Sequence, residues 1–168
     1  MISGSERQII DDAIDRNREA LIATVERLPA GEVRRSLVPS ATTPIGLVKH
    51  AASAERFWFQ RFLAGRDESE CDGPASPGEA SFAVSEHERL EDVVAEFRAA
   101  SEVSRSISSQ LDLSDVVRNS RDEPVSVRYV LVHMVEELAR HGGHADILVE
   151  QILAAESKHQ QHSAGVDQ

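Results

Sequence analysis

A glutamate and a histidine in the last third of the chain are spaced so that they could bind one metal ion together. Glu137 and His141 lie four residues apart in the stretch VRYVLVHMVEELARHGGHADILVEQI, residues 127–152. On a helix, this spacing places the two side chains on one face, about 6 Å apart along the axis. A carboxylate and an imidazole in such a position can ligate the same divalent cation.

The stretch around this pair has the pattern of one long helix with an apolar seam. Steps of four and three residues alternate along it, which gives a heptad repeat. The seam consists of Val127, Leu131, Met134, Leu138, His141, Ala145, Leu148 and Ile152. His141 is its one polar member, and Glu137 lies on the flank of the seam. We therefore expect both side chains to point toward the core.

Two further histidines on this helix are alternative ligands. His144 lies on the same flank as Glu137, so it could bind the metal, orient a ligand from behind, or contact a substrate. His133 lies four residues before Glu137 but furthest from the seam, and we expect it to face solvent. Glu136 points away from the seam and is predicted to be exposed.

A second helix supplies the third candidate ligand, His50. Thr43 is a good N-cap, Pro44 suits the first helical position, and Gly65 suits the C-terminal stop. His50 lies beside the apolar seam of this helix, as Glu137 does beside its own. The predicted seam consists of Leu47, Ala51, Ala54 and Trp58, followed by Phe62.

The remaining pattern predicts an all-α fold with four helices. The first runs from Ser5 to Leu28, and the third opens with a capping box at Ser85 and Glu88. A loop rich in Gly, Pro and acidic residues covers residues 66–83, and a polar connector covers residues 112–124. We expect one four-helix bundle domain over residues 1–156 and a polar, disordered tail over residues 157–168.

Several other features invite a chemical interpretation but support it less well. Gly142 and Gly143 lie inside the helical pattern, where glycine is unfavourable. Close helix approach, room beside a metal, or a local kink would explain them. Cys71 lies in the loop without a nearby base, so we expect an inert thiol. His159 and His162 in the polar tail could bind metal only adventitiously.

Composition narrows the possible partners. The chain has 168 residues, 18 basic and 29 acidic, and a net charge of −11. An acidic protein is a poor ligand for nucleic acid or for an anionic membrane. No apolar run approaches the roughly 20 residues of a membrane span, and the N-terminus lacks the layout of a signal peptide. One cysteine excludes an internal disulfide and is compatible with a cytoplasmic location.

Three ligands from two helices would leave a metal centre open. A bundle can hold such a centre in its core, and an open position for water or substrate is typical of catalytic zinc sites. Nickel or iron would also suit these nitrogen and oxygen ligands. The simpler interpretation is that Glu137 and His141 pair with each other and bind no metal.

Two segments resemble the DinB-like metal-binding superfamily. TTPIGLVKHAASAERFWFQRFLAG and VRYVLVHMVEELARHGGHADIL are similar to a mainly actinobacterial branch, related to mycothiol-dependent maleylpyruvate isomerase-like and bacillithiol transferase-like proteins. The resemblance implies a four-helix bundle, often a homodimer, that binds a divalent metal through His50, Glu137 and His141. The ending VEQILAA, with Val149, departs from the branch, which puts a substrate contact there in doubt.

The resemblance suggests an activity as well as a fold. It implies a metal-dependent S-transferase of a low-molecular-weight thiol such as mycothiol, with zinc as the expected metal and with catalytic residues still unassigned. Metal-assisted hydrolysis would use the same open centre. The alternatives are a non-enzymatic, stress-associated metal-binding dimer and a metal-free helical interaction module.

Overall fold

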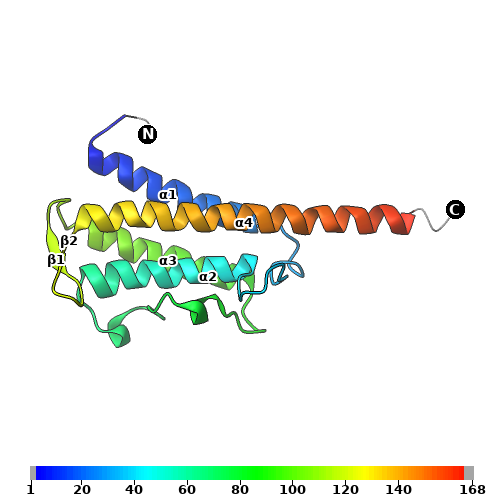
Figure 1. The fold of residues 1–168 in the computed structure, drawn as a ribbon, viewed down its shortest axis with the longest axis horizontal. Coiled ribbons are helices and arrows are strands. Elements are labelled where there is room, and N and C mark those ends of the chain that lie inside the picture. Colours follow the sequence, from blue (N-terminus) through cyan, green and yellow to red (C-terminus); the bar gives the residue numbers. More distant parts are fainter. Residues whose placement is uncertain (1–2, 165–168) are drawn as a thin grey trace.

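Four helices pack around one apolar core in the computed structural model, which describes residues 3–164 (Figure 1). Within this range the long helices are α1 (Glu6–Val25), α2 (Pro44–Glu55), α3 (Leu90–Ser108) and α4 (Val127–Ala164). Helix α1 packs on α4, and α2 packs on α3 and α4. The predicted all-α four-helix bundle is confirmed. No helix in the described part of the chain is long and apolar enough to cross a membrane.

Helix α4 is the longest element and projects beyond the other helices in Figure 1. All eight residues of its predicted seam, from Val127 to Ile152, are buried. The helix continues to Ala164, past residue 156, where we expect the domain to end. That domain boundary stays a prediction. The side chains of His159 and His162 lie outside the described residues.

The N-terminal helix is capped as the sequence predicts. The Ser5 hydroxyl accepts a hydrogen bond from the backbone N–H of Gln8, and the Gln8 side chain accepts one from the N–H of Ser5. Such a capping box satisfies two of the free N–H groups at a helix start. The helix ends at Val25 rather than at the expected Leu28, which is buried in the following turn.

The third helix begins later than predicted. The Ser85 N–H donates to the carboxylate of Glu88 at 2.7 Å, so half of the predicted capping box forms. This contact closes a turn, however, and α3 itself begins at Leu90. The carboxylate of Glu88 also accepts two hydrogen bonds from Lys49 on α2, at 2.6 and 2.7 Å. Glu88 thus ties the segment before α3 to α2.

The second helix changes its hydrogen-bond pattern halfway along. After Glu55 the chain continues as a π-helix, η1 (Arg56–Leu63), which Gly65 terminates in a left-handed conformation at φ 67°. A π-helix bonds residues five apart and therefore has more residues per turn. The predicted seam is buried at Leu47, Ala51 and Ala54. Beyond Glu55 the pattern shifts: Trp58 and Phe62 are only partly buried against the core, and Phe59 and Leu63 are buried.

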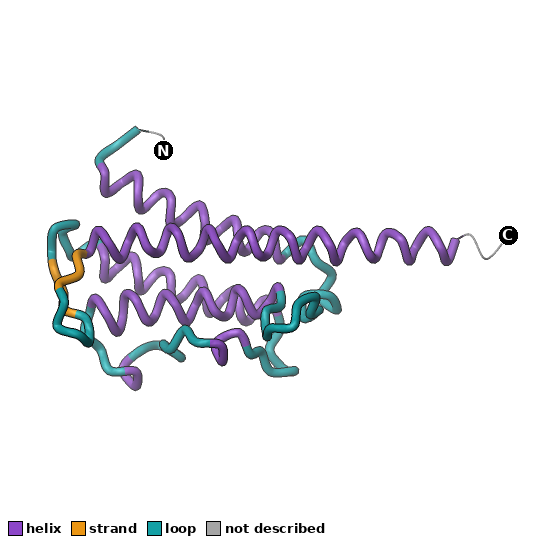
Figure 2. Tube along the Cα trace, viewed as in Figure 1, coloured by secondary structure: helices purple, strands orange, loops and turns teal. Residues whose placement is uncertain are grey.

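The predicted connector before α4 contains a small hairpin. Strands β1 (Val116–Arg118) and β2 (Pro124–Ser126) pair antiparallel, with Val117 opposite Val125. Figure 2 shows this hairpin at one end of the bundle, beside the start of α4. Short 3₁₀ segments, η2 (Glu68–Glu70) and η3 (Glu79–Phe82), lie within the long loop between η1 and α3.

A buried ion pair joins α1 to α2. The guanidinium of Arg18 donates to both carboxylate oxygens of Glu55, each at 2.8 Å. Glu55 is 0% exposed and Arg18 is 4% exposed. Asp15 also accepts a hydrogen bond from Arg18, at 2.7 Å. Because removing one member of a buried pair leaves an uncompensated charge, each partner depends on the other.

We predict that Glu55→Gln will lower the free energy of unfolding by about 3 kcal/mol, because the buried guanidinium of Arg18 loses its main counter-charge. Urea denaturation measures this loss. The matched control is Glu19→Gln, which removes an exposed pair with Arg98 at 3.2 Å and should cost less than about 1 kcal/mol. Equal losses in the two variants would contradict the assigned role of the buried pair.

Candidate metal centre

The three predicted ligands converge on one point between α2 and α4. Nε2 of His50 and Nε2 of His141 each lie 3.1 Å from the same oxygen, Oε1 of Glu137. One ligating atom from each of the three residues lies within 4.8 Å of the others. His50 is 5% exposed and His141 is 9% exposed, so the cluster is largely shielded from water.

Ser81, in the loop before α3, fixes which nitrogen of His50 faces the cluster. The Ser81 hydroxyl donates its one hydrogen to the carbonyl oxygen of Gly78, at 2.5 Å. The same hydroxyl oxygen lies 2.7 Å from Nδ1 of His50, and it can only accept there. Nδ1 of His50 therefore carries a hydrogen, and Nε2 of the neutral ring keeps its lone pair.

The positions of His50 and Glu137 favour a positive charge between their side chains. With Nδ1 protonated and the ring neutral, the lone pair of His50 Nε2 faces an oxygen of the Glu137 carboxylate. Two acceptors at that distance repel each other unless a proton or a metal ion lies between them. A hydrogen bond from His141 is the largest influence that holds the pKa of Glu137 well below its usual range, against the effect of burial. The donor set thus fits a divalent cation.

The loop that carries Ser81 can approach α2 closely because of Gly46, four residues before His50. A Cβ atom at this position would lie 2.7 Å from the carbonyl oxygen of Phe82, which is too close for any other residue. The Phe82 ring stacks on His50, with 4.1 Å between the ring centroids and 11° between the planes. Element η3 therefore both orients His50 and covers it.

The alternative ligands lie outside the cluster. His144 is exposed, and its ring centroid lies 5.6 Å from that of His141. His133 does not face solvent as predicted: it is half-buried, with its ring 4.6 Å from that of Trp58. Glu136 is exposed, as expected, and pairs with Arg140. Among the described residues, neither histidine belongs to the group that could hold the ion.

The glycine pair on α4 has no packing role within this chain. Cβ atoms placed on Gly142 or Gly143 would meet no atom of the described residues within 4 Å. Of the three explanations for this pair, close helix approach is therefore not seen within the described part of one protomer. Helix α4 continues through both positions.

Cys71, the one cysteine of the chain, behaves as a poor nucleophile. Burial raises the pKa of its thiol, although Arg61 and Arg66 act in the opposite direction. Its sulfur donates weakly to the carbonyl oxygen of Asp67, at 3.5 Å. A thiol held in its protonated form is unreactive, which agrees with the expected inert role.

Comparisons with known proteins show the family and the fold of the chain. A family model described as mycothiol-S-transferase matches residues 9–154. A solved structure described as a conserved protein of locus from Enterococcus faecalis superposes with a TM-score of 0.65 at 20% identity, covering 90% of this chain and 99% of that chain. At this identity the likeness shows the fold alone. No curated protein matches the chain.

We predict that Ser81→Ala will weaken zinc binding by about 10- to 100-fold, the usual effect of removing a group that orients a metal-binding histidine. Competition against a chromogenic chelator measures the affinity. Ser69→Ala, at an exposed position of the same loop, is the matched control and should bind zinc as the wild type does. Unchanged affinity in Ser81→Ala would contradict the positioning role.

Proposed function

Because the chain belongs to the mycothiol-S-transferase family, we propose that it is a metal-dependent enzyme that transfers a low-molecular-weight thiol to an electrophile. The observation that carries the proposal is the convergence of His50, Glu137 and His141 on one point. Within the described residues, no fourth histidine, cysteine or carboxylate joins the group. Three protein ligands leave room for a substrate.

The charge of the donor set suits a thiol substrate. One carboxylate and two neutral imidazoles would leave a divalent ion with a net positive charge of one. When bound, such an ion lowers the pKa of a thiol that coordinates it, and so supplies a thiolate nucleophile at neutral pH. The new C–S bond then replaces the bond from the electrophilic carbon to its leaving group.

The residues around the cluster prepare it for this role. Ser81 holds His50 in the tautomer that presents Nε2. The hydrogen bond from His141 lowers the pKa of Glu137, which favours the ionised form that can bind a cation. Phe82 lies against His50 and restricts the access of water from that side. The chain needs no nucleophile of its own, which fits the protonated state of Cys71.

The proposal also specifies the metal, the thiol, the location and the oligomeric state. We assign zinc as the metal, mycothiol as the thiol, the cytoplasm as the location and a homodimer as the working form. The family match supports a thiol substrate and a metal, and the imidazole and carboxylate ligands suit zinc.

We expect the metal-loaded protein to accelerate the conjugation of mycothiol with a fluorogenic haloalkyl electrophile. His141→Ala should reduce the rate at least about 100-fold, because both a ligand and the shape of the donor set are lost. Chelation should have the same effect, and added zinc should restore the wild type only. Fluorescence and mass spectrometry of the conjugate measure the reaction.

The matched control is His87→Ala, which removes an exposed histidine outside the cluster and should leave the rate unchanged. Full activity in His141→Ala, or in chelated protein, would contradict the proposed mechanism. Large stabilisation by metal without thiol binding in calorimetry would favour the non-enzymatic metal-binding protein instead.

A further inference from the structure

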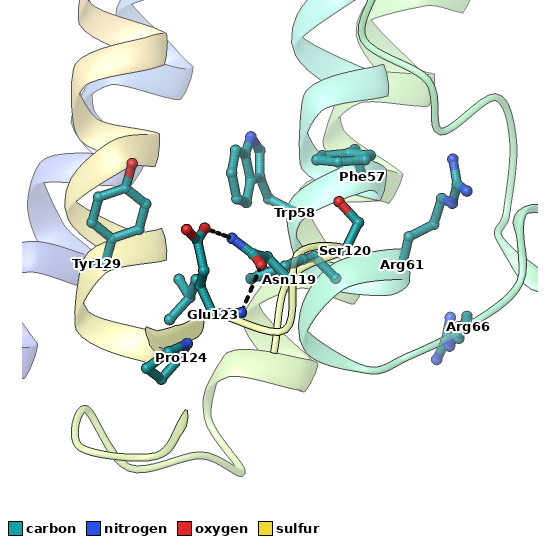
Figure 3. A pocket seen from close by; sticks show the side chains of 11 residues that line it. Phe57, Trp58, Arg61, Arg66, Asn119, Ser120, Glu123, Pro124 and Tyr129 are labelled. Atoms are coloured by element: carbon teal, nitrogen blue, oxygen red, sulfur yellow. Dashed lines mark hydrogen bonds between the residues drawn. The ribbon is translucent and has the colours of Figure 1, made fainter. Parts of the chain in front are cut away.

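A cavity of about 780 Å³ lies between η1 and the β hairpin, and none of the three proposed metal ligands lines it (Figure 3). Its walls come from the π-helix, from the hairpin turn and from the first turn of α4. A cavity of this size can hold a small organic molecule. The nature of the walls indicates which class of molecule would fit.

One wall of the cavity is aromatic. Trp58 is half-buried and lies edge-to-face with Phe57 and Phe62, with ring centroids 5.2 and 5.4 Å apart. Tyr129 faces the same space from α4 (Figure 3). These side chains line the cavity because the π-helix places Phe59 in the core and leaves Trp58 at its edge. Aromatic walls favour a ligand with a flat, apolar body.

Two arginines with weak partners lie at one end of the cavity. Arg61 donates at 3.3 Å to the carbonyl oxygen of Ala75, and its distance to Glu68 is 3.5 Å. The side chain of Arg66 has one hydrogen bond, at 3.3 Å to Oε1 of Gln60, and no ion pair within residues 3–164. By contrast, Arg18 contacts carboxylates at 2.7 and 2.8 Å. Arg61 and Arg66 therefore keep donors for an anionic ligand.

The opposite end of the cavity is negatively charged. Glu123, from the hairpin turn, accepts a hydrogen bond from the side chain of Asn119 at 2.8 Å. Figure 3 shows Glu123 across the cavity from Arg61 and Arg66. An anionic group would be attracted by the arginines and repelled by Glu123. The two ends thus define one orientation for an anion with an apolar body.

We infer that this cavity binds a small aromatic carboxylate, with its carboxylate on Arg61 and Arg66 and its ring against Trp58. The net charge of the chain is −11, so the chain as a whole repels anions. An anion can bind only where positive side chains, here Arg61 and Arg66, lie close together. Binding here needs no metal ion.

Trp58, in the wall of the cavity, contacts the part of α4 that precedes the candidate metal ligands. His133 lies with its ring 4.6 Å from that of Trp58, and it precedes Glu137 by one helical turn. A ligand beside Trp58 would therefore lie near the turn of α4 that precedes Glu137. Its role as the electrophile that receives the thiol rests on the proposed function, whereas its binding does not.

Trp58 is the only tryptophan of the chain, so its fluorescence reports on this cavity. We expect 3-phenylpropionate to change the fluorescence of Trp58 saturably, and its neutral amide to bind about tenfold more weakly. Arg61→Gln and Arg66→Gln should each weaken the binding of 3-phenylpropionate about tenfold. Glu123→Gln should strengthen it about twofold, because a nearby like charge is removed.

Two control variants test whether 3-phenylpropionate binds in this cavity rather than elsewhere on the protein. Arg98→Gln changes an exposed arginine on α3 and should leave the affinity unchanged. His141→Ala should also bind 3-phenylpropionate normally, which distinguishes a failure of the metal centre from a failure of the cavity. Absence of a saturable change, equal binding of the amide, or loss of binding in His141→Ala would overturn the inference.

Discussion

The centre of the structure depends on one electrostatic constraint: a carboxylate oxygen and two imidazole nitrogens face one another where little water can reach them. Both Nε2 atoms lie 3.1 Å from Oε1 of Glu137, and Ser81 dictates the tautomer of His50. A proton or a metal ion between Nε2 of His50 and Oε1 of Glu137 would relieve the repulsion of these two acceptors. The close approach of the loop at Gly46 and the contact between Lys49 and Glu88 serve to hold the Ser81 segment in place.

The change from α-helix to π-helix after Glu55 organises the rest of the molecule. It places Phe59 in the core and leaves Trp58 and Phe62 as the wall of a cavity. The α-helical part before it positions His50. One continuous segment thus contributes to both the candidate metal centre and the neighbouring cavity, and the buried pair of Arg18 and Glu55 anchors the junction between the two parts. π-Helical turns that interrupt an α-helix frequently lie at functional sites.

The sequence predicted the features that depend on regular helical spacing. The apolar seam of α4 follows directly from the sequence, because side chains spaced alternately four and three residues apart lie on one face of a helix. This spacing predicted that His141 points into the core. The same geometry, together with the family resemblance, pointed to Glu137 and His50 as candidate ligands, and the structure brings both side chains next to His141. The role of Ser81 could not be predicted, because it is 31 positions from His50 and reaches it through an irregular loop. The burial of Glu55 and Arg18 was equally hidden, since ionisable residues are normally exposed and only tertiary packing pairs them.

The presence of a metal centre is tested most directly by elemental analysis of the purified, untagged protein beside a His50→Ala, His141→Ala double variant. We expect about one zinc, nickel or iron ion per chain in the wild type and none in the variant. Absence of metal from both proteins, even after incubation with excess zinc, would contradict this expectation. The three side chains would then be a buried polar cluster in a helical bundle without a metal centre.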